Sequence, residues 1–230
     1  MLRDKYASRI HLLLGFETEY IRPASISLVK GLEAKYRFDY CVGSIHHVLG
    51  IPIDYNFELW DKARTACGGT DEALFAQYFD GQYQLLSQIK PMVVGHFDVI
   101  RLWAPDKNVS FRQWPRVWEK ILRNIDTVIG YGGLFELNSA AFRKGFDEAY
   151  PTSEIAKVYN LYYIYVKAIL EKGGKFVLSD DSHGVAQVGL NYPLLLQYIR
   201  DLGISQIYSL ESNEGVVRVK ARPVAGMEAS

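Results

Sequence analysis

The sequence has few cysteines and no excess of charge of either sign. Its 230 residues include two cysteines, Cys41 and Cys67, too few to build a disulfide scaffold in a chain of this length. Basic and acidic residues are equal in number, 26 of each, which argues against a general nucleic-acid-binding surface while leaving room for a local basic pocket. The cysteine count favours a reducing compartment, and the charge balance predicts no nucleic-acid partner.

Long apolar runs and several well-known catalytic motifs are also absent. No run approaches the roughly 18 apolar residues that a membrane-spanning helix needs, and residues 1–10 alternate in charge without a signal-type apolar stretch. We therefore expect a cytoplasmic protein with no membrane partner. The sequence also contains no Walker-type phosphate loop and no Gly-x-Ser-x-Gly elbow, and neither cysteine has neighbours typical of a thiolate nucleophile.

The residues that are present predict one packed domain over residues 1–230, since 49% are hydrophobic and 23% are charged. Apolar runs and helical periodicities alternate along the chain. Strands are predicted at 10–16, 40–42, 92–94, 134–137, 175–178 and 206–210, helices at 21–36, 70–89, 117–124, 154–172 and 194–202, and loops at 52–69 and 105–115. This alternation indicates an α/β fold with a parallel sheet or a (β/α) barrel, ended by a polar tail.

Residues that can bind metals follow five of the predicted strands. In chain order these are Glu17 and Glu19, His46 and His47, His96 and Asp98, Glu136 and Asn138, and then Asp180, Asp181 and His183. Taken singly, each group has an ordinary explanation as a turn, a helix cap or a solvated strand end. Together they include four of the five histidines, with only His11 elsewhere. Because barrel active sites lie at the C-terminal ends of the strands, the pattern predicts a site for Zn²⁺, Mn²⁺ or Fe²⁺.

Such a site suits the hydrolysis of phosphate esters. Two metals about 3.5–4 Å apart can bind a phosphate ester and lower the pKa of an attacking water. Arg101 lies shortly after Asp98 and is a candidate contact for the substrate phosphate, although arginines are also common on solvated loops.

Four segments in order carry a resemblance to a known family: 14–21, 38–48, 94–98 and 178–184. They contain Gly15-Phe16-Glu17, Ser44-Ile45-His46, Gly95-His96-Phe97-Asp98 and Ser179-Asp180-Asp181-Ser182-His183. With these motifs the chain resembles the fungal-type histidinol-phosphatases of the polymerase and histidinol phosphatase (PHP) family, from about Lys5 to Val219.

The resemblance implies an irregular (β/α)7 barrel with up to three divalent metals (Zn, Mn or Fe), and L-histidinol phosphate as the substrate. It implies that Glu17 bridges two metals and that His46 and His96 complete the protein ligands of one of them. Asp181 would serve the second metal. His183 would serve the third metal or contact the substrate phosphate.

One departure from the family pattern changes these expectations. The family begins with a strand that ends in His-x-His, followed by an Asp and a further His on the next strand, and none of these is present here. We therefore expect about the first two strands of the family to be absent, which would expose sheet edges and leave one metal site intact in sequence and two impaired. Three explanations stay open: a fragment or misplaced gene start, completion by another chain, or a shortened paralogue without activity.

The leading hypothesis is a histidinol-phosphatase that converts L-histidinol phosphate to L-histidinol and phosphate in histidine biosynthesis. A hypothesis from another class is a non-catalytic binding or regulatory protein that keeps the barrel surface but not the full metal centre. A third is a related hydrolase that acts on another small phosphate ester. The sequence leaves the oligomeric state open.

Overall fold

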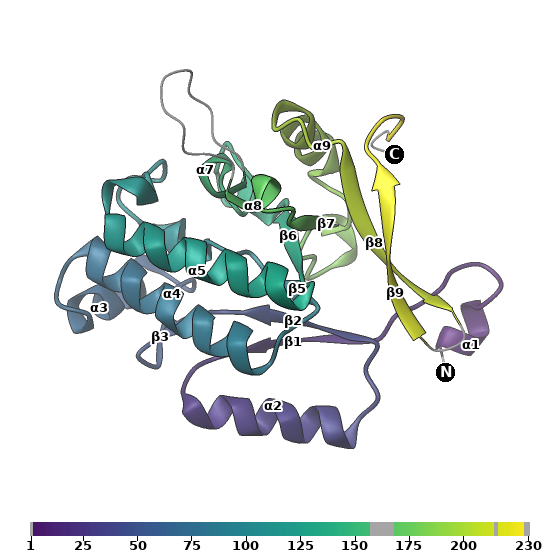
Figure 1. The fold of residues 1–230 in the computed structure, drawn as a ribbon, viewed down its shortest axis with the longest axis horizontal. Helices are drawn as coiled ribbons and strands as arrows, with labels where there is room; N and C mark the ends of the chain where they lie inside the picture. Colours follow the sequence, from purple (N-terminus) through teal and green to yellow (C-terminus); the bar gives the residue numbers. More distant parts are fainter. Residues whose placement is uncertain (1, 157–167, 214–215, 228–230) are drawn as a thin grey trace.

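The fold is built on one mixed sheet, seen in a computed structural model that describes residues 2–156, 168–213 and 216–227. The sheet has the order β1 (Gly15–Glu19), β2 (Tyr40–Ser44), β5 (Val93–Val94), β6 (Leu134–Asn138), β7 (Lys175–Ser179), β8 (Gln206–Asn213) and β9 (Val216–Pro223) (Figure 1). Neighbouring strands are parallel from β1 to β8, and β9 runs antiparallel to β8. The predicted α/β class with a mostly parallel sheet is confirmed.

Helices and short connecting elements surround this sheet. The helices are α1 (Leu2–Tyr6), α2 (Pro23–Lys35), α3 (Phe57–Ala66), α4 (Asp71–Gln88), α5 (Pro115–Tyr131), α6 (Ala140–Arg143), α7 (Ser153–Ala156), α8 (Ala168–Glu171) and α9 (Tyr192–Asp201). Short 3-10 turns lie at Val99–Trp103, Phe111–Gln113 and Val185–Gln187, and β3 (His47–Val48) pairs with β4 (Ile51–Pro52) in a small hairpin. No helix among the described residues is both long enough and apolar enough to span a membrane.

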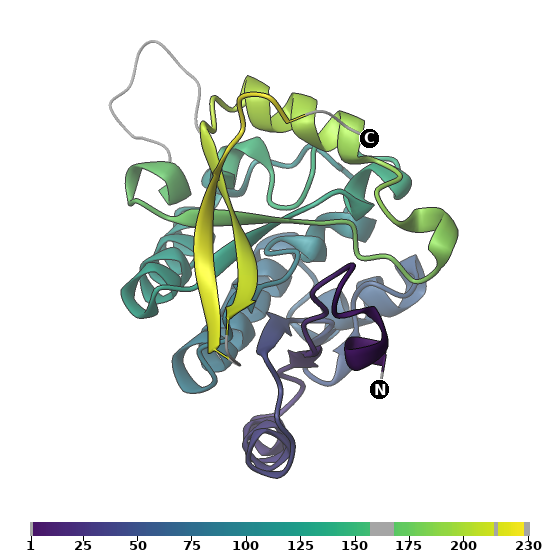
Figure 2. The same cartoon turned by 90° about the vertical axis from the view of Figure 1, so that its right-hand side faces the viewer.

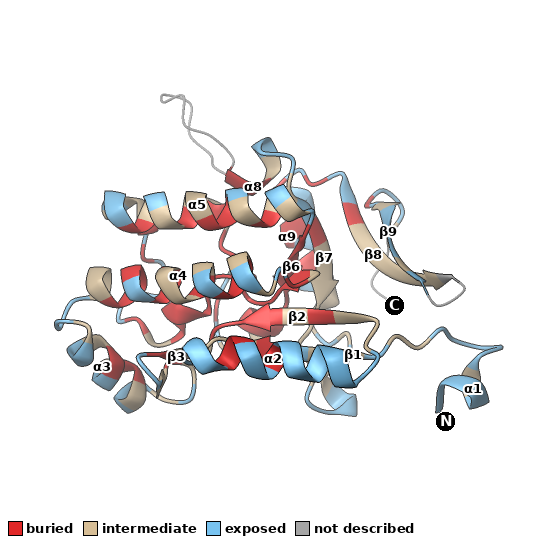
Figure 3. Cartoon of the chain, turned by 60° about the horizontal axis from the view of Figure 1, so that its bottom comes forward, coloured by how far each residue is buried: buried red, intermediate tan, exposed pale blue. Residues whose placement is uncertain are grey.

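The core lies between the sheet and the pair α4 and α5, which run side by side (Figure 1). A buried polar contact joins these two helices: the side-chain amide of Asn124 donates to the Phe79 carbonyl at 2.8 Å and to Gln82 Oε1 at 3.0 Å. By contrast, α2 buries only Ser25, Ile26 and Val29, and most of its surface is exposed (Figure 3).

Several sequence predictions are confirmed with small shifts of boundary. The helix expected at 70–89 is α4, and the Thr70 hydroxyl caps it by accepting from the Ala73 amide at 3.2 Å. The helices expected at 21–36, 117–124 and 194–202 correspond to α2, to a longer α5 and to α9. Only the two ends of the helix predicted at 154–172 are described, as α7 and α8, and its middle lies outside the described residues.

Three other predictions were wrong. The first strand begins at Gly15 and not at Ile10, because Ile10–Leu14 form no ladder and Leu14 is exposed. The loop expected at 52–69 contains α3, which Asn56 caps and whose Trp60 and Ala63 are fully buried. The strand expected at 206–210 was not the last one, because the polar tail after it contains β9, which pairs along its whole length with β8.

The sheet curves without closing in the part of the chain that is described. Its outermost strands, β1 and β9, do not pair with each other there, and Figure 2 shows the β8–β9 hairpin as two long strands set apart from β1. A cavity of about 670 Å³ lies along one face of the sheet, from β2 to β9. Its lining includes Val42 of β2, Val93 of β5, Val177 of β7 and Ile207 of β8. The inner face of the sheet is thus partly uncovered, as in an open barrel.

Candidate metal centre

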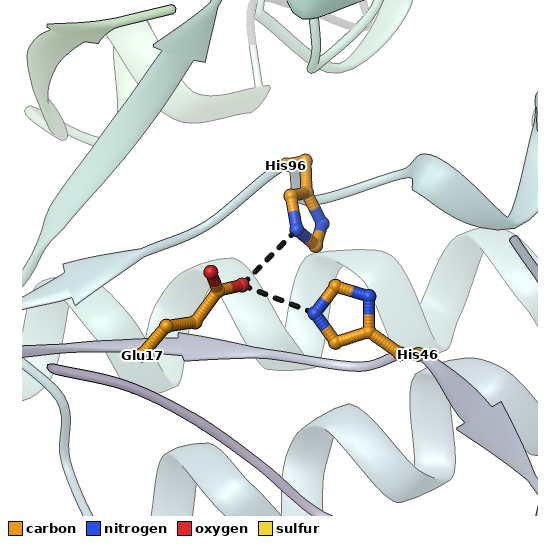
Figure 4. Close-up of side chains that lie close together, drawn as sticks. All are labelled: Glu17, His46 and His96. Carbon is orange, nitrogen blue, oxygen red and sulfur yellow. Dashed lines mark hydrogen bonds and ion pairs between the residues drawn. The ribbon is translucent and has the colours of Figure 1, made fainter. Parts of the chain in front are cut away.

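Three side chains from neighbouring strands meet at one edge of the sheet. Glu17 lies within β1, His46 follows β2 by two residues, and His96 follows β5 by two residues. Because β1, β2 and β5 are adjacent and parallel, their C-terminal ends bring the three side chains together. One ligand atom from each lies within 4.8 Å of the others, and Figure 4 shows the two imidazoles facing the Glu17 carboxylate.

The distances from the Glu17 carboxylate to the two imidazoles are close to those between the ligands of a divalent metal. Glu17 Oε1 lies 3.1 Å from His46 Nε2 and 3.3 Å from His96 Nε2. Ligands held at 2.0–2.1 Å in a tetrahedral zinc site are separated from one another by about 3.3 Å. Two imidazoles and one carboxylate are also a ligand set that zinc, manganese and iron accept. The donor chemistry and the spacing of each imidazole from the carboxylate therefore both suit such an ion.

The cluster is buried on one side and open on the other. The side chain of His96 is 6% exposed, whereas that of Glu17 is 42% exposed. Burial alone would raise the pKa of Glu17, but hydrogen bonds with His46 and His96 outweigh it and hold that pKa well below its usual range. A carboxylate that stays ionised and faces solvent leaves an open side from which a ligand can approach.

The position of His96 is fixed by its backbone. Its amide donates to Glu136 Oε2 at 2.6 Å, and the same oxygen accepts from the Asn138 side chain at 2.9 Å. A Cβ on Gly95, the residue after β5, would lie 2.3 Å from Ser44 Oγ and 3.0 Å from Val42 Cγ1, so a larger residue here would push these β2 side chains aside. Two of the potential metal ligands seen in the sequence thus have another role: Glu136 binds the backbone amide of His96, and Asn138 binds Glu136.

Asp54 contacts the cluster and was not identified from the sequence. Its Oδ2 lies 2.8 Å from His46 Nδ1, on the side of the ring away from Glu17. Burial would lower the pKa of His46, but hydrogen bonds to Asp54 and Glu17 outweigh it and raise that pKa to about 10. An ion that binds His46 therefore displaces a proton from it. In the sequence, Asp54 was only one acidic residue in a segment predicted to be a loop, so nothing pointed to its contact with His46.

Asp181 and His183 lie on the segment after β7 and are not part of the three-residue cluster. His183 Nε2 lies 3.2 Å from Asp181 Oδ1, and the His183 side chain is 78% exposed. Asp181 has a φ of 48°, a left-handed conformation that is uncommon outside glycine. Arg143 holds this backbone, because its guanidinium donates to the carbonyls of Asp180 at 2.7 Å and Asp181 at 3.0 Å. Their predicted ligand roles stay predictions.

Arg101, the predicted phosphate contact, is 2% exposed and has only internal contacts among the described residues. Its guanidinium lies 3.3 Å from Asp98 Oδ2, donates to the Ala149 carbonyl at 3.0 Å, and stacks over the rings of Phe146 and Tyr150. These contacts indicate that Arg101 has a structural role beneath the site. They do not support the predicted contact with the substrate phosphate, which stays a prediction.

A second histidine–carboxylate pair lies beside the cluster. His47 Nδ1 is 2.6 Å from Glu19 Oε1, and both side chains are about a quarter exposed. Neither residue belongs to the cluster found among the described residues. His46 and His47 thus each have a carboxylate oxygen beside Nδ1, but only His46 belongs to the candidate metal centre.

Comparison with known proteins agrees with this geometry. The sequence pattern of the PHP domain matches residues 2–140. A probable histidinol-phosphatase of Schizosaccharomyces pombe is 46% identical over 91% of this chain and 66% of its own length. The histidinol-phosphatase of Saccharomyces cerevisiae is 32% identical over 97% of this chain and 73% of its own length. The chain thus spans about two thirds to three quarters of these relatives.

Solved structures share the fold. A histidinol phosphate phosphatase from Lactococcus lactis, in complex with zinc, L-histidinol and phosphate, superposes with a TM-score of 0.68 at 16% identity and covers 94% of this chain and 75% of its own. A putative histidinol phosphatase from Listeria monocytogenes gives 0.65 at 23% identity, over 84% of this chain and 71% of its own. Since the PHP pattern matches more than half of the sequence and the S. pombe protein is 46% identical, this chain belongs to the PHP family.

Proposed function

We propose that this chain is a metal-dependent phosphomonoester hydrolase that converts L-histidinol phosphate to L-histidinol and phosphate. The observation that carries the proposal is the convergence of Glu17, from within β1, with His46 and His96, which follow the adjacent strands β2 and β5. The substrate is suggested by relatives named histidinol-phosphatases and by the L. lactis structure, which holds L-histidinol, phosphate and zinc. A cytoplasmic location suits such a biosynthetic reaction.

Each residue of the cluster has a distinct part in this proposal. His46 and His96 would hold a divalent ion such as zinc through Nε2, and Glu17 would hold it through Oε1. Such an ion, when bound, supplies Lewis-acid activation of the phosphoryl group and lowers the pKa of a water. Glu17 lies on the exposed side, so the phosphate ester would approach there. Asp181 would serve a second ion, and His183 a third ion or the substrate phosphate.

The barrel of this chain would lack about the first two strands of the family. Support comes from the unpaired outer strands β1 and β9 of the described residues and from the cavity of about 670 Å³ between β2 and β8. Two strands in that space would cover the inner faces of Val42 and Ile207 and bring further ligands. We therefore propose that Glu17, His46 and His96 form one ion site and that the sites for further ions are incomplete.

The test is phosphate release from L-histidinol phosphate by this chain with added Mn²⁺ or Zn²⁺. We expect a rate above the background of metal alone, a preference for L-histidinol phosphate within a panel of small phosphate esters, and loss of the rate in His46→Ala. No rate above background would contradict catalysis by this chain and favour a non-catalytic binding protein. A rate that His46→Ala leaves unchanged would show that the hydrolysis does not depend on the cluster.

A further inference from the structure

Asp54 lies against the proposed metal centre, yet no motif or comparison assigns it a role. We propose that Asp54 is a positioning residue that fixes the tautomer and the ring orientation of His46, so that Nε2 faces Glu17 and His96. This inference rests on the proposed metal centre and adds to it a residue that controls how tightly the ion is held.

The two nitrogens of His46 have different carboxylate partners. Nδ1 lies 2.8 Å from Asp54 Oδ2, and Nε2 lies 3.1 Å from Glu17 Oε1. When an ion displaces one proton from the ring, a carboxylate that accepts from Nδ1–H keeps the other proton on Nδ1, so the lone pair is on Nε2. Asp54 therefore selects the tautomer that a metal between Glu17 and His96 requires.

The hairpin of β3 and β4 brings Asp54 to this position. The turn at Leu49 and Gly50 has φ values of 52° and 74°, and the returning strand pairs His47 with Pro52. The Ile53 amide then donates to the His46 carbonyl at 2.9 Å, and the Ile53 side chain is fully buried. Asp54 is thus attached to a fixed backbone that is itself bonded to His46, which makes the contact a property of the fold.

The two imidazoles of the cluster differ in this respect. Within the described residues, Nδ1 of His96 is buried and has no hydrogen-bond partner. His96 is instead held by its backbone amide on Glu136 and by its burial. The side chain of His46 is 26% exposed and has less packing to fix it, so its orientation depends more on the contact with Asp54.

The experiment compares zinc affinity, measured by competition with a chelator, for the unaltered chain, Asp54→Asn and Glu19→Gln. Asp54→Asn keeps the size of the side chain and removes its charge. We expect zinc affinity to fall about 10–100-fold, the usual cost of losing such a partner of a metal-bound histidine. Glu19→Gln makes the same chemical change at the His47 pair, and we expect less than about a threefold change because His47 lies outside the cluster.

If Asp54→Asn folds poorly, the tautomer of His46 can be measured in the unaltered chain. Long-range ¹H–¹⁵N spectra of the unaltered, zinc-loaded chain should show His46 protonated on Nδ1. Asp54→Glu keeps a carboxylate at this position, so its zinc affinity should lie between those of Asp54→Asn and the unaltered chain. Equal zinc affinity in Asp54→Asn and the unaltered chain, or zinc on Nδ1 of His46, would overturn the role of Asp54 alone. No zinc binding by the unaltered chain would overturn the metal centre and this inference with it.

Discussion

Replacing His96 with alanine should lower both zinc affinity and phosphate release from L-histidinol phosphate by at least about 100-fold, since loss of a ligand should cost no less than loss of the residue that orients one. His96 Nε2 is one of the three atoms that meet at the cluster, and its side chain is 6% exposed. A water molecule in place of the ring would be a weaker metal ligand, because it would not be held in position as His96 is by its backbone hydrogen bond to Glu136. Chelator competition and a phosphate assay on the purified variant measure the two effects.

The control for this variant is His11→Ala, which removes an exposed histidine outside the strand ends. We expect its zinc affinity and its activity to equal those of the unaltered chain. Because truncating a buried ring also opens a cavity, His96→Gln and the urea midpoint of each variant separate loss of the ligand from loss of the fold. Zinc affinity in folded His96→Ala within a few-fold of the unaltered chain would remove His96 from the metal centre.

The second large effect is on stability, at the buried pair of Arg101 and Asp98. Arg101→Ala should lower the free energy of unfolding by about 3–5 kcal/mol, because it leaves a buried carboxylate without its cationic partner. The Asp98 side chain is fully buried, 3.3 Å from Arg101 Nε. The variant also loses the bond to the Ala149 carbonyl and the stacking over Phe146. Urea unfolding of the metal-free protein measures the loss.

Lys172→Ala is the comparison for this variant, because Lys172 pairs with Asp126 at 2.6 Å on the surface. An exposed pair contributes about 0–1 kcal/mol, so we expect little change in its unfolding. The same two variants decide between the two roles of Arg101. Unchanged stability of Arg101→Ala with a strongly raised KM for L-histidinol phosphate would favour the phosphate contact predicted from the sequence over the structural role.

The metal cluster was predictable because its residues lie within or just after short strands. Glu17, His46 and His96 follow short apolar runs that pair in parallel, and parallel strands bring their C-terminal ends to one edge. What the sequence could not distinguish is which strand-end residues face the cluster. Glu136 and Asn138 have similar chemistry and positions, yet they bond to the backbone of His96 and to each other.

Asp54 and β9 were not predictable for a different reason. Asp54 reaches His46 only through the hairpin of β3 and β4, whose strands have two residues each and give no period in the sequence. Within β9 only Val217 and Arg222 are half-buried and the other residues are exposed, so the segment reads as polar because it lies at the edge of the sheet. Local periodicity in the sequence could predict neither feature, because Asp54 is placed by two very short strands and β9 forms only by pairing with β8.

The most direct test of the account is an anomalous difference map at the zinc edge, from crystals of this chain grown or soaked with zinc. The account predicts a strong peak about 2.0–2.2 Å from Glu17 Oε1, His46 Nε2 and His96 Nε2. Zinc bound elsewhere on the chain, with no peak between these three atoms, would contradict the metal centre and the hydrolytic function proposed from it.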